Sequence, residues 1–172
     1  MTDQTADEPA PVRSAVLRAP AHRVSSKAPV LWAVGAAARS LLLLGGVVAT
    51  ALLTPWDPAW WWAAPLVLLL ATYVVAMPVV RYRIHRWEST DTAVYTQTGW
   101  LSREQRIAPM SRVQTVDFEQ GPLSRAVGIA TVTVTTASAA GPLKIEGIDK
   151  AVADRLVEDL TRRAEAEAGD AT

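Results

Sequence analysis

Two long apolar stretches near the start of the chain dominate its hydrophobic pattern. They cover residues 30–54 and 60–80, and the short linker between them contains Asp57 but no basic residue. A helix of about 20 apolar residues crosses the roughly 30 Å hydrocarbon core of a bilayer. The pattern therefore predicts a membrane α-hairpin of two transmembrane helices within residues 26–86.

A single charge, Arg39, interrupts the first stretch. A charged side chain at the centre of a membrane helix is costly. In one interpretation the guanidinium snorkels to the headgroup region and Arg39 marks the membrane interface. In the other, Arg39 lies within the membrane, where it pairs with a partner or lines a path.

The charges that flank the hairpin predict its orientation. Basic residues precede the first stretch, and the second is followed at once by Arg81, Arg83 and Arg86. Basic residues favour the cytoplasmic side of a membrane. We therefore expect a multi-pass protein of the bacterial cell membrane with both termini in the cytoplasm.

Tryptophans gather at the opposite end of the hairpin. They are Trp56, Trp60, Trp61 and Trp62. Because an indole ring is amphipathic, it is favoured at the membrane–water interface. We expect these four residues to anchor the outer end of the hairpin.

A cleaved signal peptide is an alternative explanation of the first stretch, since Ala49-Thr50-Ala51 fits a cleavage pattern. Cleavage there would place the Arg81 cluster outside the cell, against the charge rule. Residues 1–25 are rich in Ala, Pro, Asp and Thr and lack apolar periodicity, which is typical of a disordered cytoplasmic tail.

After the hairpin the pattern changes to short alternating segments. Residues 92–96 and 100–107 read as two strands around a turn at 97–99, and further strands are predicted at 112–119, 129–136 and 143–148. Asp149 is a candidate helix N-cap, and apolar residues at helical spacing predict an amphipathic helix at about 150–166. Residues 87–172 thus form an α+β domain of antiparallel strands and one C-terminal helix, about 85 residues with one small core.

Composition excludes several kinds of chemistry. The chain has zero formal net charge and no cysteine, so neither a global field for nucleic acid nor a thiolate site is expected. The two histidines, His22 and His85, flank the membrane segments, and no glycine-rich phosphate loop or nucleophile motif is present. We expect no enzymatic activity, no metal and no cofactor.

Several motifs together resemble one family. Two spans with a basic exit are followed by Gly99-Trp100-Leu101, by Arg112-Val113-Gln114, by Gly121-Pro122-Leu123-Ser124-Arg125 and by a Thr-rich strand. In this the chain resembles the YdbS-like bacterial membrane proteins with a pleckstrin-homology-like (PH-like) domain. The resemblance implies a partly open antiparallel β-barrel capped by the C-terminal helix.

Five polar residues are candidates for contact with lipid or with a partner. They are Arg103, Arg106, Arg112, Gln114 and Arg125. The arginines could contact anionic lipid or form a solvated strand face. Arg112 and Gln114 are expected on one face of a strand, as a recognition patch; alternatively, Gln114 and Arg125 satisfy backbone groups near the 121–128 turn. In lipid-binding PH domains the first strand–strand loop is basic, whereas the turn predicted at 97–99 is uncharged.

Three functions remain open from the sequence. The preferred one is a membrane-anchored interaction module that binds a protein partner or another copy of itself. The second is sensing of anionic membrane lipid through the arginines beside the membrane. The third is a transport or channel component built from oligomers of the hairpin around Arg39.

Overall fold

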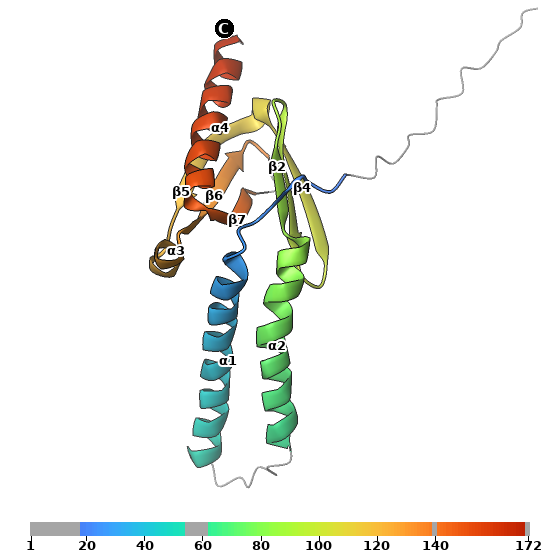
Figure 1. Ribbon diagram of the computed structural model, residues 1–172, viewed down its shortest axis with the longest axis vertical. Coiled ribbons are helices and arrows are strands. Elements are labelled where there is room, and N and C mark those ends of the chain that lie inside the picture. The colour runs from blue at the N-terminus through green and yellow to red at the C-terminus, as the bar shows by residue number, and fades with distance from the viewer. Residues whose placement is uncertain (1–17, 54–61, 139–140, 171–172) are drawn as a thin grey trace, which may run out of the picture.

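The computed structural model describes residues 18–53, 62–138 and 141–170, with side chains to residue 166. Two long antiparallel helices, α1 (Ala28–Leu53) and α2 (Ala63–Ile84), form a hairpin that carries a β-rich domain at one end (Figure 1). Both helices are long and apolar enough to cross a membrane. In the most apolar 18-residue segment of each helix, only 6% (α1) and 11% (α2) is buried. Most of this apolar surface is therefore available to lipid.

The domain consists of two antiparallel sheets that do not close into a barrel. The first has the order β1 (His22–Arg23), β2 (Arg86–Ser89), β3 (Ala93–Gly99) and β4 (Arg103–Pro109). The second has the order β5 (Val113–Glu119), β6 (Ile129–Thr136) and β7 (Leu143–Asp149). A 3-10 turn, η2 (Met110–Arg112), links the sheets, and a short helix, α3 (Pro122–Val127), links β5 to β6.

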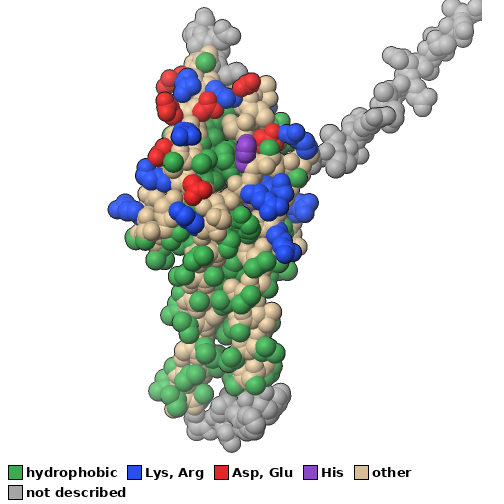
Figure 2. All heavy atoms as spheres, in the orientation of Figure 1, with side chains coloured by type: hydrophobic (Ala, Val, Ile, Leu, Met, Phe, Trp, Pro, Cys, Tyr) green, Lys and Arg blue, Asp and Glu red, His purple; other side chains and the backbone are tan. Residues whose placement is uncertain are grey.

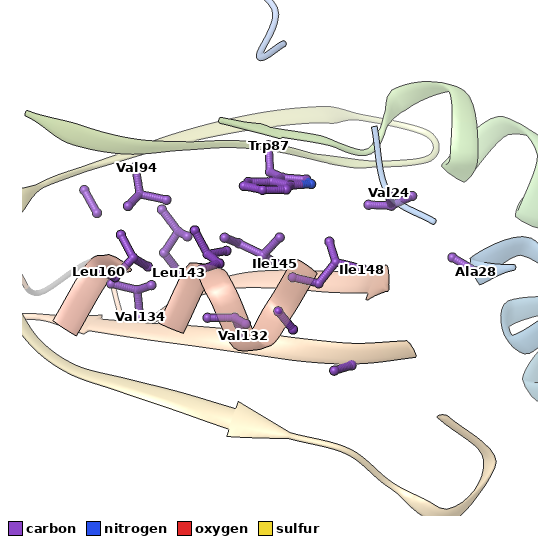
Figure 3. Packing of buried hydrophobic residues seen from close by; sticks show 14 of the residues in the cluster. Val24, Ala28, Trp87, Val94, Val132, Val134, Leu143, Ile145, Ile148 and Leu160 are labelled. Atoms are coloured by element: carbon purple, nitrogen blue, oxygen red, sulfur yellow. The ribbon is translucent and has the colours of Figure 1, made fainter. Parts of the chain in front are cut away.

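The C-terminal helix α4 (Lys150–Asp170) closes the domain against the second sheet. Its apolar residues Ala153, Leu156 and Leu160 are buried, as the helical spacing predicted. All three belong to the main apolar cluster of the domain. Figure 3 shows Leu160 in this core with Val94 and Trp87 of the first sheet and Val132, Val134 and Ile145 of the second. The predicted α+β PH-like architecture, a partly open antiparallel structure capped by a C-terminal helix, is therefore confirmed.

The core does not stop at the domain. The same apolar cluster continues through Val24 and Ala28 into Trp32, Ala36 and Met77 of the two membrane helices. The domain and the domain-side end of the hairpin therefore pack as one unit.

Residues 18–25 correct the predicted tail. Their backbone is ordered: His22 and Arg23 pair with Trp87 and Arg86 of β2, and Val24 and Ser25 are buried. The prediction of a disordered tail to residue 25 is therefore too long, while residues 1–17 lie outside the described residues. A strand of two residues is too short to show an alternating pattern in the sequence. It forms only because it pairs with β2, which is distant in the sequence.

The first hairpin of the domain also differs from expectation. Gln97, Thr98 and Gly99 belong to β3, and the turn lies at residues 100–102. Gly99 has φ +125, and a Cβ there would lie 1.8 Å from the carbonyl oxygen of Ser102, so the turn requires glycine at this point. The uncharged loop predicted at 97–99 is wrong, and Trp100 and Leu101 form the tip instead.

Two further boundaries move. Arg112 ends the 3-10 turn, and the pairing of β5 with β6 shifts between Val113 and Thr115, so Arg112 and Gln114 do not share a strand face. The helix α2 continues past residue 80 to Ile84, and Arg81 and Arg83 form its last turn. The basic exit is thus partly helical, which positions Arg81 for the contacts described next.

Candidate functional site

The start of α1 docks on a bulge in β7. Gly147 is skipped in the pairing of β6 with β7, and its backbone has φ +76. A Cβ on Gly147 would lie 2.8 Å from the Cβ of Ala28, so only glycine allows this approach. Ser25 N–H donates to the Gly147 carbonyl at 2.8 Å, and Ser25 Oγ donates to Asp149 Oδ1 at 2.8 Å.

Arg81 connects α2 to the domain. Its guanidinium pairs with Glu146 of β7 at 2.5 Å and lies 4.4 Å from the ring centroid of Trp32 on α1. Its Nε donates to His85 Nε2 at 3.2 Å. One side chain thus joins both membrane helices to the second sheet, and a stacked cation is well suited to this role.

His85 is buried beside Arg81, with its ring 5.0 Å from that of Trp32. Burial, and then the Arg81 guanidinium, lower the pKa of His85 to about 4, although the hydrogen bond to the Arg81 carbonyl opposes the shift. The neutral ring donates from Nδ1 to that carbonyl at 3.0 Å and accepts from Arg81 at Nε2. Both ring nitrogens are therefore engaged.

Gln97 joins the end of α2 to the first sheet. Its side chain is buried, with Nε2 donating to the Ile84 carbonyl at 2.7 Å and Oε1 accepting from Gln105 at 2.9 Å. The helix end and the first sheet are therefore held by paired polar groups. The segment 97–99, predicted as a turn, is instead a structural contact.

A cleft of about 420 Å³ lies between the hairpin and the domain. The membrane helices contribute Arg39, Tyr73, Met77, Arg81 and His85 to its lining. The domain contributes residues of β3, β4 and β7 and their neighbours, namely Thr96, Thr98, Gly99, Trp100, Glu104, Arg106, Pro142, Lys144 and Glu146. Figure 2 shows basic side chains gathered where the domain meets α2, above the apolar surface of the hairpin.

The cleft carries an excess of positive charge. Four cations and two carboxylates line it, and His85 is neutral. Glu146 pairs with Arg81, and Glu104 pairs with Arg106 at 2.5 Å. The side chains of Arg39 and Lys144 form neither an ion pair nor a hydrogen bond within the described residues.

The predicted contact residues do not form one site. Arg106 lines the cleft, whereas Arg103 is exposed at the start of β4 and Arg112 is exposed in η2. Gln114 and Arg125 are exposed on β5 and α3. Within the described residues no hydrogen bond joins the side chain of Gln114 or Arg125 to the backbone, whereas the side chain of Gln120 donates to the Ile129 carbonyl at 2.9 Å.

The residues predicted at the membrane interface have different environments. The side chain of Arg39 points back toward the domain. Its guanidinium lies 3.7 Å from the Cβ position of Gly35, which is one helical turn nearer the domain. Arg83 is exposed, whereas Arg86 is half-buried in β2 and donates to the Pro20 carbonyl at 3.4 Å. Trp62 lies at the start of α2, at the linker end as predicted, and Trp56, Trp60 and Trp61 lie outside the described residues.

Sequence reasoning missed Trp32, Lys144 and Glu146. Trp32 reads as one more apolar residue of a membrane span, and the two charged residues read as the solvent side of a strand. A lone glycine inside a strand pattern, here Gly147, is a signal for a bulge or a close backbone approach. It was the one available sign that β7 contacts another element.

A second candidate surface lies along β5. This strand pairs with β6 on one side and, within the described residues, with no strand on the other. Phe118 is 38% exposed there, and Leu123 of the neighbouring α3 is 58% exposed. Unpaired strand edges with exposed apolar side chains are favourable places for another strand to add.

Comparison with known proteins agrees with this architecture. The family model described as "Bacterial PH domain" matches residues 30–164, which include α2 and nearly all of α1 and of the domain. The chain is also similar to the "UPF0699 transmembrane protein YdbS" of Bacillus subtilis (strain 168), with 31% identity over 150 residues. The alignment covers 84% of this chain and 93% of that relative. No solved structure matches the chain.

Proposed function

The chain belongs to the bacterial PH domain family of membrane proteins, and from this premise we propose that it is a non-enzymatic interaction module at the cytoplasmic face of the cell membrane. The hairpin holds the domain in one orientation, and the open edge of β5 binds a protein partner or a second copy of the chain. The observation that carries the proposal is that edge, with Phe118 exposed on it.

The β5 edge has the properties of a docking strand. It is seven residues long, which is enough for a continuous ladder of backbone hydrogen bonds. Asp117 and Glu119 flank Phe118 in the sequence and are exposed on the opposite face of the strand, so the edge presents one apolar anchor on one face and two carboxylates on the other. A partner strand with an apolar residue flanked by basic residues would complement it.

The environments of the histidines support a role without catalysis. His85 is held neutral with both ring nitrogens engaged by Arg81, so it has no free nitrogen to accept a substrate proton. The ring of His22 stacks 5.1 Å from that of Trp87 at the edge of the first sheet. Neither lies among groups arranged for proton transfer.

Charge supports the cytoplasmic orientation. Lys27 precedes α1, and Arg81 and Arg83 end α2, all on the domain side of the hairpin, while the linker side offers no basic residue within 54–59. A reporter fused after Thr172 should therefore be cytoplasmic, and one inserted in the linker should be external. An external C-terminal reporter would overturn this orientation.

Cross-linking tests the interaction directly. Because the natural chain has no cysteine, Asp117→Cys carries a single photoactivatable label on β5, and Glu165→Cys on the exposed face of α4 is the matched control. In native membranes the β5 label should give one discrete adduct that the α4 label does not. An added mass equal to the chain identifies a second copy, and any other discrete mass identifies a partner.

Loss of that adduct in Phe118→Asp would support the edge as the docking surface. Lys150, whose ammonium lies 5.7 Å from the Phe118 ring centroid, pairs with Asp154 at 2.7 Å and keeps that partner in the variant. Identical adduct patterns from the two labelled positions would contradict the proposal.

A further inference from the structure

We infer that the cleft between the hairpin and the domain binds the phosphate group of an anionic membrane lipid. This site is independent of the β5 edge, because its lining residues come from α1, α2, β3, β4 and β7. The proposal therefore stands or falls separately from partner docking.

The position of the cleft matches the headgroup region. Arg39, Tyr73 and Met77 of the two membrane helices line one side of the cleft, and residues of the domain line the other. A ligand held between them lies where the apolar hairpin ends and the polar domain begins (Figure 2). A lipid headgroup occupies this level without leaving the bilayer.

The unpaired cations supply the reason for an anion. The carboxylates of the cleft are already bound, Glu146 by Arg81 and Glu104 by Arg106. The side chains of Arg39 and Lys144 line the same cleft and form no ion pair within the described part of the chain. A cation inside a membrane span is costly unless an anion accompanies it, and a phosphate can accept two parallel hydrogen bonds from a guanidinium.

The direction of Arg39 agrees with this role. Side chains on a helix tilt toward its N-terminus, and the N-terminus of α1 lies at the domain. The guanidinium accordingly lies beside Gly35, one turn nearer the domain, with its nearest nitrogen 3.7 Å from the position of a Cβ there. The cation snorkels along its own helix into the cleft.

The tip of the β3–β4 hairpin indicates a lipid rather than a soluble phosphate. Trp100 packs edge-on against Tyr73 of α2, with ring centroids 5.7 Å apart. Trp100 is 39% exposed and the adjacent Leu101 is 83% exposed. These apolar side chains lie alongside a membrane helix, where the acyl chains of a bound lipid would cover them.

Native mass spectrometry of the full chain released from detergent tests the site. The probes are phosphatidylglycerol and phosphatidylcholine with identical acyl chains, and inorganic phosphate is the soluble competitor. We expect selective retention of phosphatidylglycerol. Arg39→Gln and Lys144→Gln should each weaken that retention about fivefold, the effect of removing one charge near an anionic headgroup.

Arg155→Gln, on an exposed part of α4, removes a charge outside the cleft and should leave retention unchanged. Lys144 lies in the domain, so Lys144→Gln does not change a membrane helix. Its lipid retention can therefore be measured even if Arg39→Gln inserts poorly into the membrane. Equal retention of the two lipids, or an equal loss in the Arg155 variant, would overturn the proposal. Displacement of phosphatidylglycerol by an equal concentration of inorganic phosphate would overturn the assignment to lipid.

Discussion

Two regions of the molecule differ in how their polar groups are paired: the junction between the hairpin and the domain, and the outer edge of β5. At the junction, partners far apart in the sequence are joined: Arg81 with Glu146, Ser25 with Asp149, and Gln97 with the Ile84 carbonyl. Along the edge of β5 the strand has no strand partner in the described part of the chain, and Phe118 is exposed. The chain uses its long-range polar contacts to fix the domain on the hairpin and leaves the other surface available.

This contrast separates stability from function. Changes at the junction should cost stability, because buried groups lose partners or collide. Changes at the β5 edge should cost binding but little stability, because exposed side chains contribute little to folding.

Gly147→Val should have the largest effect. A branched side chain in a left-handed backbone costs about 1–2 kcal/mol, and forcing its Cβ against Ala28 adds about 1–3 kcal/mol. Thermal unfolding of the full chain in detergent measures the loss. Gly141→Val is the matched control, since Gly141 has φ +78 but nothing within 4 Å of its Cβ position, and an equal loss in both variants would contradict the docking contact.

The pH dependence of His85 should come next. Because the pKa of His85 is lowered from 6.5 to about 4, the unfolded chain binds its proton first. The stability that depends on a neutral His85 is therefore fully present above pH 6.5. The free energy of unfolding decreases as the pH falls toward 4, by up to about 3 kcal/mol. Unfolding of the natural chain and of His85→Gln should be compared at pH 7.5, 6 and 5. Parallel curves for the two proteins would show that His85 is not the group responsible.

Glu146→Gln should have a moderate effect. The variant keeps a hydrogen-bond acceptor for Arg81 but removes the charge, and the pair is partly exposed, so the expected loss is about 1 kcal/mol. Glu104→Gln, in the more exposed pair with Arg106, should change the free energy of unfolding by much less. Denaturant unfolding in detergent distinguishes the two, and a larger loss for Glu104→Gln would reverse the assigned importance of the pairs.

Phe118→Asp should have the smallest effect on stability. Its side chain is partly exposed, so the expected change in the free energy of unfolding is about 0.5 kcal/mol or less. In the same variant the β5 cross-link should disappear. A large loss of stability would mean that Phe118 belongs to the fold rather than to a docking surface.

Local patterns in the sequence predicted most of the fold. The apolar lengths of α1 and α2, the β-branched run of β6 and the helical spacing of Ala153, Leu156 and Leu160 each depend on neighbouring residues. Such features are visible in one segment at a time. The strand β1 was not predicted, because two residues are too few to show the alternation of apolar and polar residues that marks a strand.

The junction was not predictable in the same way. Arg81, Glu146 and Trp32 lie far apart in the sequence and come together only when β7 meets the hairpin. Their charges and rings resemble ordinary flanking residues until that contact forms. Among the five predicted contact residues, only Arg106 lies in the cleft, because strand faces were inferred without the turn at 100–102 and the 3-10 turn at 110–112.

The central claim is that the hairpin and the domain form one rigid unit, and a spin-label distance tests it most directly. In the natural chain, which has no cysteine, labels at Leu52→Cys on α1 and Arg155→Cys on α4 report the orientation of the domain in lipid nanodiscs. We predict one narrow distance distribution, which Gly147→Val broadens. A broad or multimodal distribution in the absence of Gly147→Val would contradict the claim.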